Sequence, residues 1–276
     1  MKVKYRYNSL EDFLISKPLN LDGQLDDGWG AAFPAKGREI DATVLFCDIS
    51  AFSRRTLQLN PAETLIFVNQ FFAWVTAEAM RSGHGIVDKY IGDEMMIVFS
   101  SEFGSADPFK EAVTTARWMG EFDAFSFCPH IGIASGRVIV GYVGTPMKYN
   151  CSVFGAPVAL AARCAGIKPE RTKKRPPSCS IVFPATEWGV RDFATVFPPR
   201  RYKNPGGSIK ERAHPWELRA PRTVPMKNIP DVEIREIVNK AMWVPQQTPE
   251  ARAKECLTLL REAGRYQPLD ADELQT

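Results

Sequence analysis

The chain has 276 residues, of which 45% are hydrophobic and 24% charged, as in an ordinary globular protein with a sizeable core. Its formal net charge of +3 is small, so we expect no nucleic-acid partner, which would need a concentrated basic face. The six cysteines and three histidines are scattered without metal-ligand spacing, which excludes a typical zinc site and suits a reducing cytoplasm. No secretion signal or membrane span is recognisable, so we expect no direct membrane insertion.

Residues 1–40 are expected to form an N-terminal arm, most of it loop, because glycines and Pro34 interrupt it. The first strong element is the apolar run from Ala42 to Cys47, which is typical of a buried central strand. Asp48 follows directly. The sequence therefore predicts a carboxylate at the end of a central strand.

A long helix is predicted next. Asn60 can cap its first turn, Pro61 suits the first helical position, and Glu63 completes a capping box. Apolar residues follow at helical spacing, and Gly83 and Gly85 end the pattern.

A hairpin signal follows, with strands at 85–91 and 94–99 around a Gly92-Asp93 turn. Residues 107–120 read as a helix and 127–134 as a strand. The element order is β-α-β-β-α-β, the ferredoxin-like arrangement. We therefore expect an α+β fold with an antiparallel-rich sheet and helices on one face.

The later elements are expected to be a strand at 137–143 after a turn at Ser135-Gly136, a helix at 153–164, a basic proline-rich loop at 168–177, a strand at 180–183, a hairpin around Gly206-Gly207, and two helical stretches within 230–265. This pattern predicts a main domain over 41–218 and a helical C-terminal extension over 219–276.

Asp48 and Asp93 are the candidate metal ligands. The predicted topology makes their strands neighbours, and two carboxylates at adjacent strand ends suit Mg²⁺ or Mn²⁺. The backbone carbonyl of Ile49 is the nearest further ligand. Each aspartate alone also has a plain interpretation, since aspartate is common in Gly-Asp turns and at strand ends.

Four segments, in order and with their internal spacing kept, resemble the signatures of class III adenylyl and guanylyl cyclases. They are Phe46-Cys-Asp-Ile-Ser-Ala-Phe-Ser53, Asp88-Lys-Tyr-Ile-Gly-Asp-Glu-Met-Met-Ile-Val-Phe99, His130-Ile-Gly-Ile-Ala-Ser-Gly-Arg-Val-Ile-Val-Gly-Tyr-Val-Gly144, and Tyr149-Asn-Cys-Ser-Val-Phe-Gly155 followed by Val158-Ala-Leu-Ala-Ala-Arg163. The resemblance covers about residues 41–218 and implies that they form a nucleotidyl cyclase catalytic domain.

This resemblance implies a phosphorus–oxygen lyase in which the ribose 3′-hydroxyl attacks the α-phosphate and pyrophosphate leaves. Asp48 and Asp93, with the carbonyl of Ile49, would hold two divalent ions, Mn²⁺ or Mg²⁺. Arg163 matches the arginine that neutralises transition-state charge. The substrate is also expected to meet Phe46, Ser50, Ala51 and Phe52, although the family often has a glycine in this last stretch.

The resemblance further implies a homodimer with shared active sites. In the family, one subunit supplies the metal aspartates, and the other supplies the base-reading residues and the arginine. One copy of each motif in this chain therefore predicts two equivalent sites.

The base-reading positions depart from the family. Lys89 stands where adenylyl cyclases place the lysine that reads adenine, which disfavours GTP. Ser152 replaces the second purine-reading residue and can donate or accept. Ala159 replaces an asparagine that contacts the ribose, and alanine cannot make that bond.

These departures leave three hypotheses open. The first is a pyrimidine cyclase that uses UTP, or CTP, because the short arm, the lack of a sensor domain and the C-terminal tail resemble the bacterial pyrimidine cyclases of antiphage defence. Their cyclic nucleotide activates a separate effector. The second is an adenylyl cyclase, which Lys89 favours. The third, suggested by Ala159, is a non-catalytic module that binds nucleotide.

Overall fold

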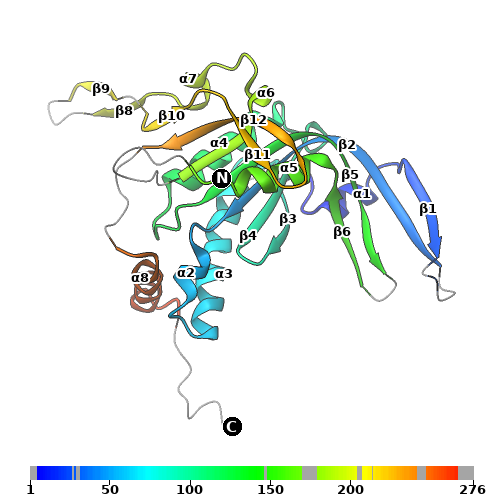
Figure 1. Cartoon of the computed structure of the whole chain (residues 1–276), viewed down its shortest axis with the longest axis horizontal. Coiled ribbons are helices and arrows are strands. Elements are labelled where there is room, and N and C mark those ends of the chain that lie inside the picture. The colour runs from blue at the N-terminus through cyan, green and yellow to red at the C-terminus, as the bar shows by residue number, and fades with distance from the viewer. Residues whose placement is uncertain are drawn as a thin grey trace, which may run out of the picture.

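The computed structural model describes residues 5–26, 28, 32–145, 148–169, 179–203, 207–212, 214–240 and 247–266. Within these ranges, one ten-stranded sheet forms the centre of the molecule (Figure 1). Its main path runs β10-β12-β7-β5-β2-β4-β3, while β1, β6 and β11 pair with β2, β5 and β12. The predicted basic loop at 168–177 lies mostly outside the described residues.

The predicted β-α-β-β-α-β order is confirmed. Its elements are β2 (Ala32–Asp48), α3 (Pro61–Ala79), β3 (Ile86–Ile91), β4 (Glu94–Phe99), α4 (Pro108–Glu121) and β5 (His130–Thr145). The capping box that starts α3 is also present, with the Asn60 side chain accepting from the Glu63 amide and the Glu63 side chain accepting from the Asn60 amide. The pairs β2–β4, β3–β4 and β2–β5 are antiparallel.

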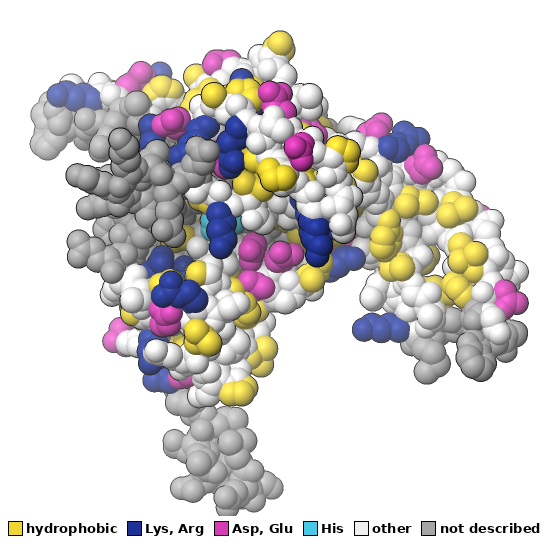
Figure 2. All heavy atoms as spheres, in the orientation of Figure 1, with side chains coloured by type: hydrophobic (Ala, Val, Ile, Leu, Met, Phe, Trp, Pro, Cys, Tyr) yellow, Lys and Arg dark blue, Asp and Glu magenta, His cyan; other side chains and the backbone are white. Residues whose placement is uncertain are grey.

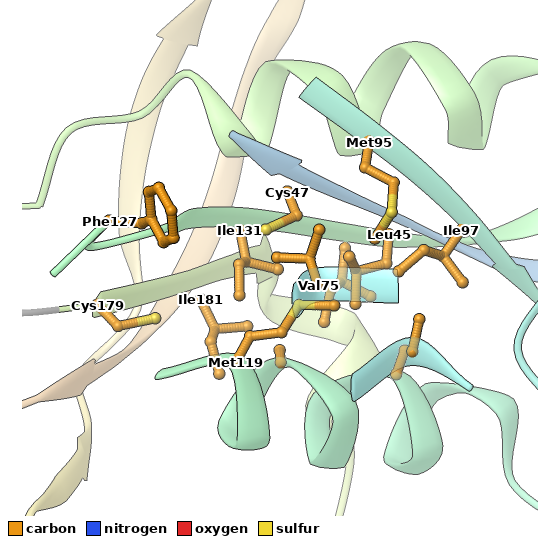
Figure 3. Packing of buried hydrophobic residues seen from close by; sticks show 14 of the residues in the cluster. Leu45, Cys47, Val75, Met95, Ile97, Met119, Phe127, Ile131, Cys179 and Ile181 are labelled. Carbon is orange, nitrogen blue, oxygen red and sulfur yellow. The ribbon is translucent and has the colours of Figure 1, made fainter. Parts of the chain in front are cut away.

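Helices α3 and α4 pack on one face of the sheet, as predicted, and their apolar side chains form a core with alternate residues of the strands (Figure 3). Val75 of α3 and Met119 of α4 are fully buried there against Leu45, Cys47 and Ile131. The opposite face is not bare. It is covered by α5 (Ala156–Ala165) and α1 (Leu10–Ile15), so helices lie on both faces of the whole sheet.

Two strands are longer than the sequence pattern indicates. β2 begins at Ala32 and pairs with β1 (Leu21–Asp26), so the expectation that the arm is mostly loop is wrong. β5 runs through Ser135 and Gly136 without turning, because both residues pair in register with β2. β5 then pairs with β6 (Lys148–Phe154).

The C-terminal region also contributes strands. β7 (Cys179–Pro184) and the predicted hairpin of β8 (Arg200–Lys203) and β9 (Ile209–Arg212) are confirmed. Helix predicted from residue 230 is wrong, because Ile229–Asn239 is strand β12, which pairs with β7, β10 (Trp216–Leu218) and β11 (Arg222–Met226). The main sheet thus continues past residue 218, where the catalytic domain was expected to end.

Shorter helices complete the fold: α2 (Phe52–Thr56), the 3₁₀ helix at Ser101–Phe103, α6 (Ala185–Trp188) and α7 (Phe193–Val196). The last helix, α8 (Pro249–Glu262), confirms the second predicted helical stretch and packs on α2 and α3. Among the described residues, no helix combines the length and apolar character needed to cross a membrane.

Candidate active site

Asp48 is the last residue of β2 and lies between two neighbouring strands. It pairs in register with Glu94 of β4 on one side and with His130 of β5 on the other. Its carboxylate is half-buried, and its Oδ1 atom is buried without a hydrogen-bond partner among the described residues. A buried, unpaired carboxylate oxygen is unfavourable unless a ligand completes it.

Asp93 lies in the turn between β3 and β4, and the structure brings it to Asp48. Burial, a side-chain hydrogen bond with Asp93, and the charges of Asp93 and Glu94 raise the pKa of Asp48 to about 8. Burial and the charge of Asp93 also raise the pKa of Glu94. Two carboxyls this close hold a proton between them unless a cation replaces it.

These features fit a divalent cation, since hard oxygen ligands, like-charge crowding and an orphaned carboxylate oxygen coincide at one strand end. Within the described ranges, however, no group of three or more His, Cys, Asp or Glu side chains is arranged to hold a metal. A cation held here would complete its coordination with oxygens of backbone, water or substrate. The side chain of Ile49, the predicted carbonyl ligand, is buried in the core and anchors the backbone at this point.

The turn after Asp48 leads directly into α2. Ala51 caps this helix in the left-handed conformation, with φ 56° and ψ 37°. Ala51 is exposed and Ser50 half-buried, while Phe52 packs against the core. The fourth predicted substrate residue, Phe46, is only 3% exposed and packs in the core under α5.

The predicted base-reading residues Lys89 and Ser152 meet at a third residue that the sequence did not single out. The Ser152 hydroxyl donates to Asp88 Oδ2 at 2.7 Å, and Lys89 Nζ lies 3.4 Å from the same oxygen. Asp88 occupies a bulge in β3, where the pairing with β4 shifts register. A bulge is a recognisable signal only once strand pairing is known.

A cavity of about 280 Å³ opens at these residues. Besides Asp88, Lys89 and Ser152, it is lined by Val87, Asn150, Cys151 and the α1 residues Ser9, Leu10 and Glu11. Glu11 accepts a hydrogen bond from the Tyr142 hydroxyl at 3.0 Å. The N-terminal arm is therefore part of the wall of this pocket.

Arg163 and Ala159 lie on α5, and both are exposed. Among the described residues, Arg163 forms no hydrogen bond or ion pair, and none joins it to the carboxylates of Asp48 and Asp93. The single chain thus brings Asp48 to Asp93 and Lys89 to Ser152, and it leaves the arginine facing outward. Figure 2 shows a small group of acidic side chains near the middle of one face, with lysine and arginine side chains around it.

Comparison with known proteins agrees with this geometry. Residues 35–168 match the family of the adenylate and guanylate cyclase catalytic domain. The uncharacterised protein Rv1318c of Mycobacterium tuberculosis is 32% identical over 154 residues, which are 55% of this chain and 28% of the relative. The chain therefore spans less than a third of that relative's length.

Solved structures show the same fold. The adenylyl cyclase CyaB from P. aeruginosa aligns with a TM-score of 0.55 and 17% identity over 75% of this chain and 98% of that one. The guanylyl cyclase Cya2 aligns with a TM-score of 0.52 and 21% identity over the same shares, 75% and 98%. The chain therefore has the α+β fold of these solved class III cyclases, and its residues 35–168 are similar to the adenylate and guanylate cyclase catalytic domain.

Proposed function

We propose that the protein is a nucleotidyl cyclase that converts a nucleoside triphosphate to its 3′,5′-cyclic monophosphate and pyrophosphate. The observation that carries this proposal is the pair of Asp48 and Asp93, crowded at the end of β2 with one carboxylate oxygen unpaired. Such a pair either shares a proton or binds cations, and bound cations would attract a polyanionic ligand. Two divalent ions, Mn²⁺ or Mg²⁺, would activate the ribose hydroxyl and neutralise the triphosphate when bound.

The chain's own residues would bind the cations, contact the phosphates and neutralise their charge. Asp48 and Asp93 hold the cations with the carbonyl of Ile49, and the turn at Ser50–Phe52 presents backbone to the phosphates. Arg163 is exposed and without a partner among the described residues, so it is available to a second molecule. It would neutralise charge on the phosphates as the oxygen bridging to pyrophosphate leaves.

We propose a homodimer in which each site uses both subunits. Support comes from Arg163, which is exposed on α5 and forms no ion pair with the carboxylates of its own chain among the described residues. A second copy supplies the arginine and the pocket of Lys89 and Ser152 to Asp48, and two-fold symmetry makes both sites complete.

The proposed substrate is a pyrimidine nucleotide, UTP before CTP. Lys89 and Ser152 are both engaged with Asp88, so neither projects freely toward a purine as the adenylyl pattern requires. Glu11 and Leu10 of α1 also narrow the pocket. The cyclic pyrimidine nucleotide would serve as a second messenger that activates a separate antiphage effector in the cytoplasm, where the six free thiols stay reduced.

Two other functions remain as alternatives, and each is suggested by one residue. Lys89 lines the pocket and stands where adenylyl cyclases place the lysine that reads adenine, which favours an adenylyl cyclase. Ala159 lacks a side chain that could hold the ribose, which favours a nucleotide-binding protein without cyclase activity.

One assay tests all three. The purified protein is incubated with Mn²⁺ and each of ATP, GTP, CTP and UTP, and cyclic products are identified by mass spectrometry. We expect cyclic UMP, or cyclic CMP, as the main product, and a loss of about a thousandfold or more in Asp48→Ala. Cyclic AMP as the main product would overturn the pyrimidine assignment, and binding without any product would overturn the cyclase assignment.

A substitution at the pocket adds a second readout. Lys89→Glu should change the ratio of products among the four nucleotides if Lys89 contacts the base. Asp88→Ala should change it as well, because it removes the acceptor that holds both Ser152 and Lys89. An unchanged product ratio in both variants would place the base elsewhere. Lys148→Glu, on β6 outside the pocket-lining residues, is the matched charge control.

A further inference from the structure

Among the described residues, Arg55 of α2 is the largest side chain that is fully buried, with 0% of its surface exposed. It lies seven positions after Asp48, and the sequence pattern did not single it out. A buried guanidinium is strongly unfavourable unless hydrogen bonds and charge satisfy it. Its contacts therefore show what it is there to hold.

Those contacts join two segments of backbone. Arg55 Nε donates to the carbonyl of Ser50 at 2.7 Å, inside the turn that follows Asp48. Its Nη2 donates to the carbonyls of Ser126 at 2.6 Å and Phe127 at 3.0 Å, in the segment that enters β5. One side chain thus ties the proposed metal-binding turn to the strand that pairs with Asp48.

Backbone strain gathers around the same side chain. Among the described residues, four other than glycine have a positive φ: Ala51, Ser126, Cys128 and Asn228. Three of them adjoin the contacts of Arg55: Ser126 carries one of the bonded carbonyls, and Ala51 and Cys128 follow residues that carry the other two. Strained backbone of this kind persists only where its surroundings enforce it, and it is concentrated at functional sites.

Arg55 lies near one group of opposite charge, Asp123, and one of like charge, Arg252. Asp123 is buried nearby and accepts the amide hydrogens of Phe127 and Cys128 at 2.9 and 2.7 Å. Arg252 of α8 donates to the same Ser126 carbonyl at 3.4 Å. Burial and the charge of Arg252 lower the pKa of Arg55 to about 10, which leaves it protonated at neutral pH.

Helix α8 closes this cluster from outside. Its apolar face, formed by Ala253, Cys256, Leu257 and Leu260, is buried in the main core. At its ends, Glu250 pairs with Arg54 at 3.0 Å and Arg261 with Glu63 at 3.4 Å. Helix α8 therefore covers Arg55 and shields it from solvent.

We propose that Arg55 is a positioning residue for the metal site, and that it fixes the turn from Asp48 to Phe52 by holding the Ser50 carbonyl. With that carbonyl held, the peptide groups on either side, including the carbonyl of Ile49, keep one orientation toward the cations. The proposal rests on the proposed function, because it assigns Arg55 to the metals that function requires.

The experiment compares Arg55→Met and Arg55→Lys with Arg54→Met. Arg54 is the neighbouring residue of α2 and pairs with Glu250 of α8. Among the described residues its side chain forms no hydrogen bond with the turn, so it controls for weakened docking of the helix. Mn²⁺ binding is measured by calorimetry without nucleotide, kcat and the Mn²⁺ dependence of turnover are measured separately, and thermal unfolding reports the fold.

We expect Arg55→Met to bind Mn²⁺ about tenfold more weakly or worse, with turnover partly restored by excess Mn²⁺. Arg55→Lys should recover part of the affinity, and Arg54→Met should stay within about twofold of the parent. Parental Mn²⁺ affinity and kcat in a folded Arg55→Met would overturn the proposal. Loss of cooperative unfolding in both Arg55 variants would also overturn it, because Arg55 would then serve the fold as a whole.

The Mn²⁺ isotherm separates this proposal from the proposed function. A parent protein that binds Mn²⁺ and cyclises no nucleotide refutes the cyclase assignment, while the same isotherms still decide the role of Arg55. A parent that cyclises a nucleotide, with Arg55→Met unchanged, refutes only the role of Arg55.

Discussion

The carboxylates of Asp48 and Asp93 repel each other in the metal-free protein, and this repulsion can be measured. Asp48→Asn removes one charge and keeps the shape, so it should raise the metal-free Tm by about 2–4 °C for each kcal/mol of relieved repulsion. The same variant should lose cyclase activity. Calorimetric melting in EDTA tests the first result, and a Tm equal to or below that of the parent would contradict it.

The pKa of Asp48 also predicts a pH dependence. Its folded-state pKa of about 8 lies above the ordinary value near 3.8, so the folded state binds this proton more tightly than the unfolded state. The free energy of unfolding that this group contributes is therefore present at low pH and lost as pH rises through about 8. Metal-free melts at pH 6 and pH 8.5 should show a smaller decrease in Asp48→Asn than in the parent.

Ala51 offers a second residue-scale prediction. It adopts a left-handed conformation that disfavours a Cβ atom, so Ala51→Gly should stabilise the protein by about 0.5–1 kcal/mol. Asn228→Gly is the control, because asparagine tolerates its φ of 65° better than alanine does. Chemical denaturation measures both, and a destabilised Ala51→Gly would show that the turn needs the methyl group.

At the residue scale, the sequence predicted what local pattern can encode. The apolar run before Asp48 and the Gly-Asp turn at Asp93 were enough to expect that these two residues meet. Asp88 and Arg55 were beyond reach, since their roles depend on a strand bulge and on carbonyls more than 70 residues away in the chain. No spacing rule reports such contacts.

At the scale of elements, α5 depends on a close approach to β5. A Cβ atom at Gly132 would lie 2.0 Å from the Ala161 carbonyl oxygen and 2.2 Å from the Ala165 amide nitrogen. Gly132→Ala must therefore push away the helix that carries Arg163, and we expect a loss of about 3 kcal/mol in the free energy of unfolding. Gly23→Ala in β1 is the control, because its nearest contact is at 3.9 Å. Equal unfolding midpoints for the two variants would contradict the packing argument.

The strand residues that the sequence did not predict were missed for one physical reason. The stretch from Asp231 to Arg235 alternates polar and apolar residues, as a strand does, but prolines nearby suggested interrupted helices. Ser135 and Gly136 are common turn residues, and here long-range pairing with β2 keeps them extended. Tertiary pairing overrode local preference in both places.

At the scale of the whole molecule, shared sites predict complementation. Asp48→Ala and Arg163→Ala each disable both sites of a homodimer, whereas a mixed dimer keeps one site intact. Mixing the two variants under conditions of subunit exchange should restore about a quarter of the parental activity. The cyclic nucleotide yield of the mixture, beside that of each variant alone, measures this. A mixture no more active than its parts would place Arg163 outside the partner's site.

The long central strand β2 also sets the order in which this chain can fold. Its residues from Gly37 to Asp48 find their β5 partners only between His130 and Gly141, so the pairing closes loops of roughly a hundred residues or fewer. Contacts this distant in sequence slow folding. Until residue 134 has left the ribosome, Val44, Leu45 and Phe46 keep one strand edge unpaired even after they pair with β4, so a nascent chain halted before that point is prone to aggregate.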